Sequence, residues 1–182
     1  ADAAPTMVQV GNEITNGLLW PSGLKPNFDE IAVYISAGIR GVRDVEDKIP
    51  VMLHLDNGGF HSMYVEWFDN YVRRGEDFEI IGLSYYPFWD GSMENMSRVL
   101  ELIQERYGKK AFLAETSYAY TIEDGDGFGN SFNAKDAVEG YDVSVDGQAS
   151  ILHDICEHVN EVGAAGVFYW EGSWIPVESA SE

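Results

Sequence analysis

The chain has 182 residues, of which 45% are hydrophobic and 13% aromatic, so it has enough apolar side chains for a core and is not generally disordered. It carries 11 Lys and Arg against 31 Asp and Glu, a net charge of −20, which argues against nucleic acid and anionic membranes as partners. The length predicts one domain, residues 1–182, with no second domain. Because no apolar run approaches the roughly 18 residues of a membrane span, membrane insertion is not expected.

Five short apolar runs predict buried parallel strands, because apolar and polar residues alternate little within them. In chain order they cover residues 7–11, 51–55, 80–84, 111–114 and 166–170. Segments with helical spacing lie between them, at residues 28–42, 62–74, 92–107 and 145–162. We expect the third helix to begin at a Ser92 cap and to stop at Gly108. Asp56 and Asn57 are expected near the cap of the second helix. The alternation predicts successive βα units.

The residues that follow the strands distinguish between two α/β folds. A dinucleotide-binding sheet carries a glycine fingerprint after its first strand, and GNEITNG is not such a motif. Four of the five runs instead end in polar or aromatic pairs: Asn12–Glu13, Asp56–Asn57, Tyr85–Tyr86 and Glu115–Thr116. A (β/α)8 TIM barrel gathers its chemistry at this end of its strands. We predict such a barrel, of which five strands can form only a part.

Glu13 and Glu115 end the first and fourth of these runs. In an eight-stranded barrel, strands three steps apart face each other across the mouth, so the two carboxyl groups could flank one bond. Retaining glycoside hydrolysis needs such a pair, one carboxyl as the acid and one as the nucleophile, about 5–5.5 Å apart. Asn12, just before Glu13, could bind a sugar hydroxyl. The alternative is that each glutamate is only a capping or salt-bridged residue.

Several sequence blocks resemble one known family. The blocks VQVGNEITNGLLWP, LHLDNGG, GLSYYPFW, FLAETSYAYT and GVFYWEGSWIPV are similar to successive strand-end blocks of glycoside hydrolase family 53, in order and over nearly the whole chain. The members of that family are endo-β-1,4-galactanases, (β/α)8 barrels that cut the galactan side chains of pectin with retention. The resemblance implies that Glu13 is the general acid/base and Glu115 the nucleophile. It also implies that the chain holds the fourth to eighth barrel strands, without the first three strands and the last helix.

Aromatic side chains crowd the predicted mouth of the barrel. They are Trp20, Tyr85, Tyr86, Trp89, Tyr118, Trp170 and Trp174. The C–H faces of sugar rings stack on such side chains, although Tyr118 and Trp174 could equally be core residues. The predicted substrate-binding residues are therefore Asn12, Trp20, Asp56, Asn57, Tyr85, Tyr86, Trp89 and Trp170. The partner is then a polysaccharide, β-1,4-galactan.

Three further residues invite a chemical interpretation. His54 lies within LHLDN and is expected to point into the barrel, as a hydrogen-bonded core residue or as a catalytic one. Ser84 also ends a strand, but no histidine partner is implied for it, which disfavours a serine hydrolase. Cys156, the only cysteine, falls on the expected apolar face of a helix and is predicted to be a buried, inert thiol.

The segment EDGDGFGN within the long acidic loop places oxygen ligands at alternate positions: Asp124, Asp126, the carbonyl of Phe128, and Asn130. Such spacing resembles half of a calcium loop without its closing glutamate, and a solvated acidic loop is the alternative. Some members of the resembled family carry calcium in the corresponding loop, which favours a structural calcium ion. No organic cofactor is expected.

Other functions remain open on the sequence. Related barrel enzymes have the same Asn-Glu pair and a second, nucleophilic glutamate, but they cut xylan, mannan or cellulose. A non-catalytic carbohydrate-binding protein would keep the aromatic residues without needing Glu115. A calcium-dependent interaction domain would leave the paired glutamates unexplained. A polysaccharide does not cross membranes, so an extracellular or periplasmic location is expected, with a monomeric complete enzyme. The five-stranded piece alone is expected to be unstable or to associate.

Overall fold

The computed structural model describes residues 5–125, 127 and 129–172 of the chain. Its strands are β1 (Val8–Gln9), β2 (Val51–Leu55), β3 (Ile80–Ser84), β4 (Lys110–Thr116) and β5 (Val167–Tyr169). The α-helices are α1 (Phe28–Val45), α2 (His61–Tyr71), α3 (Met93–Tyr107) and α4 (Val145–Glu161), with 3₁₀ turns η1 (Ile14–Asn16) and η2 (Ala134–Asp136). All four strand pairings are parallel, in the order β1-β2-β3-β4-β5.

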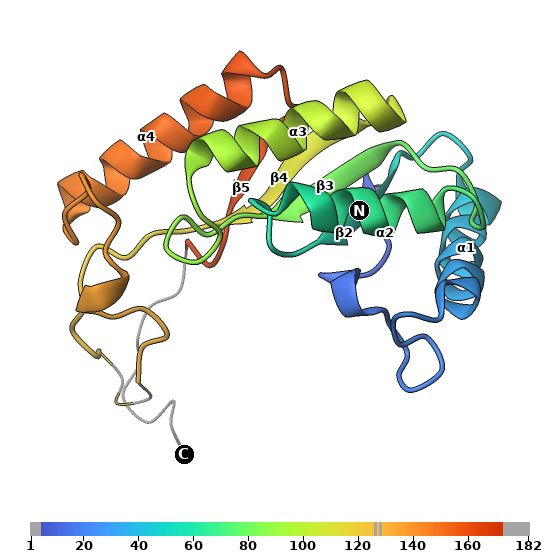
Figure 1. Ribbon diagram of the computed structural model, residues 1–182, viewed down its shortest axis with the longest axis horizontal. Coiled ribbons are helices and arrows are strands. Elements are labelled where there is room, and N and C mark those ends of the chain that lie inside the picture. Colours follow the sequence, from blue (N-terminus) through green and yellow to red (C-terminus); the bar gives the residue numbers. More distant parts are fainter. Residues whose placement is uncertain (1–4, 126, 128, 173–182) are drawn as a thin grey trace.

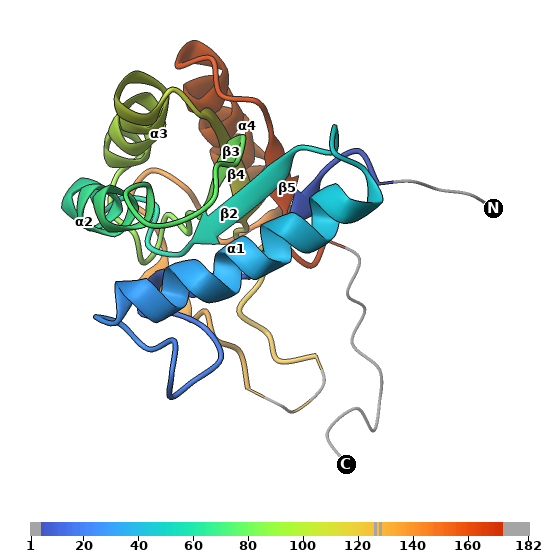
Figure 2. The same ribbon diagram turned by 90° about the vertical axis from the view of Figure 1, so that its right-hand side faces the viewer.

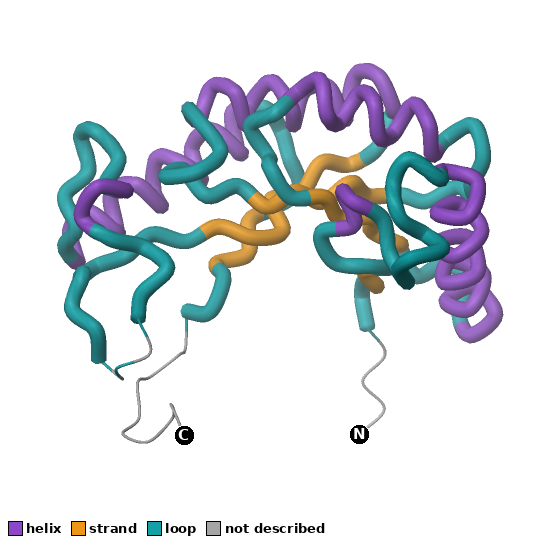
Figure 3. Tube along the Cα trace, turned by 60° about the horizontal axis from the view of Figure 1, so that its bottom comes forward, coloured by secondary structure: helices purple, strands orange, loops and turns teal. Residues whose placement is uncertain are grey.

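The sheet is curled, and the helices cover its outer side. Figure 1 shows α3 and α4 above the strands, α2 level with them and α1 at one end, and Figure 2 shows the same helices arranged around the strands. In Figure 3 the chain forms an arch, with the strands along its inner side and the helices along its outer side. The predicted fold is confirmed: the five βα units form part of a (β/α)8 barrel, a curled half-barrel.

The two faces of the sheet carry different side chains, as the period of two along a strand requires. Leu53, Ile81 and Leu113 belong to the main core between the sheet and the helices. The opposite face holds a smaller cluster of Met52, Ile80 and Ala114. The described residues cover this inner face incompletely: Phe168 on β5 is 52% exposed, although its ring lies against that of Phe112, tilted by 54°.

The expected helix ends are partly confirmed. The side chain of Ser92 caps α3 by accepting from the Asn95 amide, and Gly108 ends the helix with a left-handed backbone, φ 63°. Helix α2, however, begins after Phe60 without a side-chain cap, so Asp56 and Asn57 do not cap it. No helix among the described residues has the length and apolar character needed to cross a membrane.

The prediction of a buried Cys156 was wrong. The thiol lies on the exposed side of α4, whose buried positions are Gly147, Ile151, Ile155 and Val159. These four residues recur every four positions, and Cys156 falls just outside the stripe that they define.

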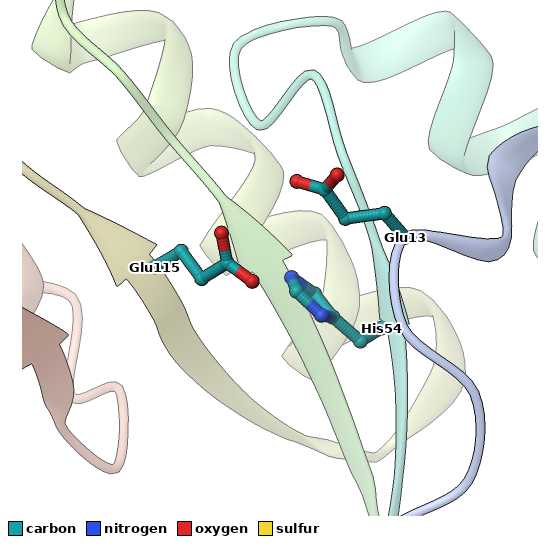
Figure 4. A group of neighbouring side chains, drawn as sticks. All are labelled: Glu13, His54 and Glu115. Atoms are coloured by element: carbon teal, nitrogen blue, oxygen red, sulfur yellow. The ribbon is translucent and has the colours of Figure 1, made fainter. Parts of the chain in front are cut away.

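A shift of register between β3 and β4 places Glu115. Leu83 pairs with Leu113, but the next residue, Ser84, pairs with Glu115, so that the pairing passes over Ala114. Leu113 packs toward the helices and Ala114 toward the inner face. Glu115 follows Ala114 and also points to the inner side, at the mouth of the half-barrel (Figure 4).

Candidate active site

A cleft of about 1400 Å³ opens at the carboxyl ends of the strands. The segments that follow all five strands line it, which is the arrangement predicted from the strand-end residues. Of the predicted site residues, the cleft wall includes Asn12, Glu13, Asp56, Asn57, Tyr86, Trp89, Glu115, Asn130 and Trp170. The active centre of a barrel enzyme lies at this end of the strands.

The two predicted glutamates face each other at the base of this cleft (Figure 4). One carboxyl oxygen of Glu13, one of Glu115 and a ring nitrogen of His54 all lie within 4.8 Å of one another. Glu13 comes from the turn after β1, His54 from β2 and Glu115 from β4. The fold therefore brings together two carboxyl groups that are 102 residues apart in sequence.

Glu115 is buried and held in place by one phenol. Its side chain is 6% exposed, and the Tyr86 hydroxyl donates to its Oε2 atom at 2.9 Å. Burial raises the pKa of Glu115, the hydrogen bond from Tyr86 opposes that rise, and the nearby charge of Glu13 adds to it. The hydrogen bond from Tyr86 therefore fixes the orientation of the Glu115 carboxyl group in the cleft wall.

Glu13 occupies an unusual backbone position. Its φ and ψ angles are 47° and 50°, in the left-handed region that costs a non-glycine residue about 1 kcal/mol or more. The turn is anchored below it, because Ile14 is buried and its carbonyl accepts from the indole of Trp67. This anchoring holds the carboxyl group of Glu13 over the cleft at the expense of backbone strain.

His54 and Ser84 connect to Glu13 in a way that the sequence did not indicate. Ser84 Oγ is 2.6 Å from Oε1 of Glu13 and 2.9 Å from Nε2 of His54, while His54 Nδ1 is 3.1 Å from Oδ1 of Asn12. The inference that Ser84 has no histidine partner was therefore wrong. Ser84 is 1% exposed and bonded to a carboxyl group, so it is not presented as a nucleophile.

His54 is neutral in this environment. The ring is fully buried, and burial lowers its pKa to about 4, against an opposing contribution from Asp56. Both ring nitrogens already have hydrogen-bond partners, Asn12 and Ser84. Glu13, His54 and Glu115 have the spacing of metal ligands, but the hydrogen bonds of both His54 nitrogens leave the ring no free nitrogen for a metal ion.

A second acidic pair lines the cleft beside the glutamates. Asp90, which the sequence analysis missed, is 6% exposed, and burial raises its pKa to about 6. The Oδ1 atom of Asp56 is buried and has no hydrogen-bond partner among the described residues. Asn57, in the left-handed region at φ 56°, follows it on the same wall. Asp56 and Asn57 thus lie in the cleft wall, and their binding of sugar hydroxyl groups stays a prediction.

The aromatic predictions divide into two groups. Tyr86, Trp89 and Trp170 line the cleft, and the two indoles are 56% and 46% exposed. Tyr85 is fully buried in the main core, where its hydroxyl donates to the Gly91 carbonyl, so its predicted contact with substrate does not fit its position. The reason is the alternation along β3, which turns adjacent side chains to opposite faces.

The remaining aromatic residues have a weaker connection with the cleft. Trp20 is 66% exposed in the segment between η1 and α1 and is not part of the cleft wall. Tyr118 lines the cleft but is 3% exposed, and its hydroxyl donates to the Tyr141 carbonyl. Trp174 lies outside the described residues.

The acidic loop is described only in part, because Asp126 and Phe128 lie outside the described residues. The carboxylate of Asp124 accepts from the amides of Gly127 and Gly129. The side-chain amide of Asn130 donates to the carbonyls of Ile122 and Glu123. These hydrogen bonds connect described residues of the loop to one another, and the calcium ion of this loop stays a prediction.

Comparison with known proteins agrees with this geometry. A model of Glycosyl hydrolase family 53 matches residues 1–182. The Endo-beta-1,4-galactanase of Bacillus subtilis (strain 168) is 40% identical over 173 residues, 94% of this chain and 39% of that protein. The solved Ignisphaera aggregans GH53 catalytic domain superposes with a TM-score of 0.89 at 39% identity, over 95% of this chain and 49% of that one. The chain spans about half or less of the length of these relatives.

Proposed function

The chain belongs to glycosyl hydrolase family 53, and from this membership and the paired carboxyl groups we propose that it carries the catalytic residues of an endo-acting β-1,4-galactanase. The observation that carries the proposal is the approach of Glu13 and Glu115 within 4.8 Å at the base of the cleft. The substrate is then the β-1,4-linked galactan of type I arabinogalactan side chains in pectin. The printed names of relatives from Bacillus subtilis and Aspergillus oryzae, an endo-beta-1,4-galactanase and a probable arabinogalactan endo-beta-1,4-galactanase, support this substrate class.

The carboxyl separation supports hydrolysis with retention of configuration. Retaining glycosidases hold their carboxyl groups about 5–5.5 Å apart, whereas inverting enzymes need about 6.5–9.5 Å to admit a water molecule. The approach of one oxygen of Glu13 and one of Glu115 to within 4.8 Å supports the shorter, retaining separation. We assign Glu115 as the nucleophile, because it is the buried carboxylate with a fixed donor from Tyr86.

The reaction then proceeds in two steps. Glu13 gives its proton to the glycosidic oxygen while an oxygen of Glu115 bonds to the anomeric carbon, and the sugar beyond the broken bond leaves as an alcohol. Glu13, now ionised, removes a proton from water, whose oxygen displaces Glu115 and restores both groups. Trp89 and Trp170, exposed in the cleft wall, would stack on sugar rings on either side. Because the substrate is a polymer, the complete enzyme acts outside the cytoplasmic membrane.

Reducing-end release from linear β-1,4-galactan, with xylan and mannan alongside, tests the proposal. The assay uses a complete barrel, in which the chain follows the first barrel strands of its Bacillus subtilis relative. Glu115→Gln should abolish galactan cleavage, and Glu105→Gln, an exposed change on α3, should leave it intact. Cleavage of xylan or mannan instead would overturn the substrate. A folded barrel that binds but cleaves no polymer would indicate a carbohydrate-binding protein.

The stereochemistry of the product tests the mechanism separately. Proton NMR during the first minutes of hydrolysis should show the β anomer at the new reducing end before mutarotation produces the α anomer. Initial appearance of the α anomer would show inversion and would contradict the role assigned to Glu115.

A further inference from the structure

The segment that follows β4 lines the cleft without being part of a strand. β4 ends at Thr116, which pairs with Tyr169 of β5, and residues 117–121 continue along the cleft wall. Backbone groups beyond the end of a ladder need other partners, or the segment opens easily. The partners of this segment therefore determine how firmly that part of the wall is held.

One tyrosine side chain takes the place of a strand beside Tyr118. The Tyr169 hydroxyl donates to the Tyr118 carbonyl at 3.0 Å and accepts from the Tyr118 amide at 3.3 Å. The side-chain amide of Gln148, on α4, donates to the same carbonyl and, at 3.0 Å, to the Tyr169 hydroxyl. Both backbone groups of Tyr118 are thus bonded to side chains of β5 and α4, beyond the last pairing of β4.

The side chain of Tyr118 does the same for the far end of the loop. Its hydroxyl accepts from the amide of Val138 at 3.1 Å and donates to the carbonyl of Tyr141 at 3.0 Å. Its ring contacts Phe132, with 5.4 Å between the ring centroids, and Phe132 in turn contacts Phe88 at 5.0 Å. The loop between β4 and α4 is therefore attached through one residue at its beginning, its middle and its end.

Tyr120, two residues further along the chain, presents its ring to solvent instead. The ring is 54% exposed in the cleft wall, and Tyr120 does not belong to the hydrophobic core of the described residues. A single exposed aromatic residue is ordinary on a protein surface. An exposed ring on a wall whose backbone is already held, however, is preorganised for a ligand, because binding has less freedom to remove.

We propose that Tyr120 is a further sugar-binding residue of the cleft, and that Tyr169, Gln148 and Tyr118 are positioning residues that hold the wall from which it projects. The inference rests on the proposed function, in which the cleft binds β-1,4-galactan. Tyr120 stacks on a galactose ring of the bound chain. The three positioning residues act through the backbone and side chain of Tyr118.

The chemistry of galactose suits such a ring. One face of β-galactose presents C–H groups, because the axial oxygen on C4 lies on the other face, and aromatic side chains bind the C–H face. Trp170 lies on the neighbouring segment, since its amide donates to the Thr116 carbonyl at 2.9 Å. The β4–β5 side of the cleft therefore carries two exposed rings, Tyr120 and Trp170, and a polymer, unlike a single sugar, can contact both.

Galactan kinetics in the complete barrel give the first test. Tyr120→Ala should raise KM about 2–10-fold with kcat little changed, because stacking is lost equally before and during reaction. Tyr120→Phe keeps the ring and should stay close to the parent. Ile122→Ala is the matched control, since Ile122 is 51% exposed in the same loop but is not part of the cleft wall. Equal KM values for Tyr120→Ala and the parent would overturn the proposal.

Direct binding separates this inference from the proposed function. In the Glu115→Gln background, calorimetric titration with galactan oligosaccharides should give a Kd about 2–10-fold weaker when Tyr120 is replaced by Ala. An unchanged Kd would refute the role of Tyr120 and leave the proposed function standing. A barrel that cleaves no galactan, but whose affinity depends on Tyr120, would refute only the proposed reaction. A barrel without affinity for galactan would refute both.

The positioning role is tested by Tyr169→Phe, alone and combined with Tyr120→Ala. Alone, the loss of the hydroxyl should raise KM by no more than Tyr120→Ala does. In a chain that already lacks the Tyr120 ring it should raise KM no further, because Tyr169 acts through that ring. An unchanged KM in the single variant, or effects that multiply in the double variant, would contradict this role. If Tyr169→Phe does not fold, Gln148→Met, which removes the other donor to the Tyr118 carbonyl, takes its place.

Discussion

The hydroxyl group of Tyr86 donates to Oε2 of Glu115 across 2.9 Å, joining the segment after β3 to the end of β4. The bond fixes one carboxylate oxygen. The carboxyl group as a whole faces Glu13 (Figure 4). A hydrogen bond to the charged form favours that form, and here it opposes the burial that raises the pKa of Glu115.

Replacing Tyr86 with Phe should therefore weaken catalysis without disturbing the fold. Loss of a hydrogen bond to a charged group, about 1.5–3 kcal/mol, corresponds to a fall in kcat/KM of about 10–100-fold. Because the pKa of Glu115 then rises further, the acidic limb of the pH profile should move to higher pH. Tyr85→Phe is the control, since that hydroxyl binds the Gly91 carbonyl away from the glutamates. An acidic limb unchanged in Tyr86→Phe would show that the bond does not tune Glu115.

Asp90 should make the fold less stable as the pH rises from about 4 to about 6. Its folded-state pKa is raised to about 6 from an ordinary value of 3.8, so the folded chain retains a proton in this range that the unfolded chain has lost. The loss should be about 1–3 kcal/mol at pH 7. Asp90→Asn keeps an oxygen for the Tyr86 amide but cannot ionise, so its melting temperature should exceed that of the parent at pH 7 and match it at pH 4.

Melting curves at pH 4, 5, 6 and 7 test this dependence. Asp44→Asn, an exposed change on α1, should follow the parent chain at every pH. Parallel curves for Asp90→Asn and the parent would mean that Asp90 ionises normally in the folded chain.

Calcium should stabilise the acidic loop that carries Asp124 and Asn130. Because a bound ion stabilises only the folded state, we expect a chelator to lower the melting temperature and added calcium to restore it. Asp124→Asn should reduce this response, since it removes one of the predicted charged ligands. Identical melting curves with and without chelator would exclude a structural ion in this loop.

The inner face of the sheet should cause the 182-residue chain to associate. Among the described residues β1 and β5 each pair with one neighbouring strand only, and Phe168 is 52% exposed on β5. Sedimentation velocity should show a mass that increases with concentration, and Phe168→Ser should lower it more than Phe60→Ser, an exposed change beside α2. A monomer with a sharp melting transition independent of concentration would contradict this prediction.

The sequence predicted those features that depend on local pattern. The apolar runs fell on the five strands, and the caps of α3 were read correctly from Ser92 and Gly108. Glu13 and Glu115 could be paired because a barrel places strands three steps apart across its mouth. The resemblance to family 53 identified the same pair.

Features that depend on register could not be predicted. The contact of His54 with Ser84 requires β2 and β3 to pair in one particular alignment, which apolar runs do not specify. Tyr85 and Tyr86 are chemically alike and adjacent, and only the alternation along the chain buries one and exposes the other to the cleft. Asp90 was missed because a single carboxylate in a loop gives no pattern.

Ala114 is the unpaired residue of a bulge between β3 and β4, and this affects which single-residue deletions the site tolerates. Because the β3–β4 pairing omits that one residue, deleting Ala114 would restore an unbroken ladder from Leu83 and Leu113 onward. Strict alternation from Leu113 would then still turn Glu115 to the inner face, opposite Ser84, and would turn Thr116 toward the helices. Loss of this one codon would therefore make the strand more regular and keep Glu115 on the face of the sheet where it meets Glu13. Loss of one residue between Val51 and Leu55, where the pairing with β3 has no extra residue to give up, would instead turn the side chains that follow to the wrong face.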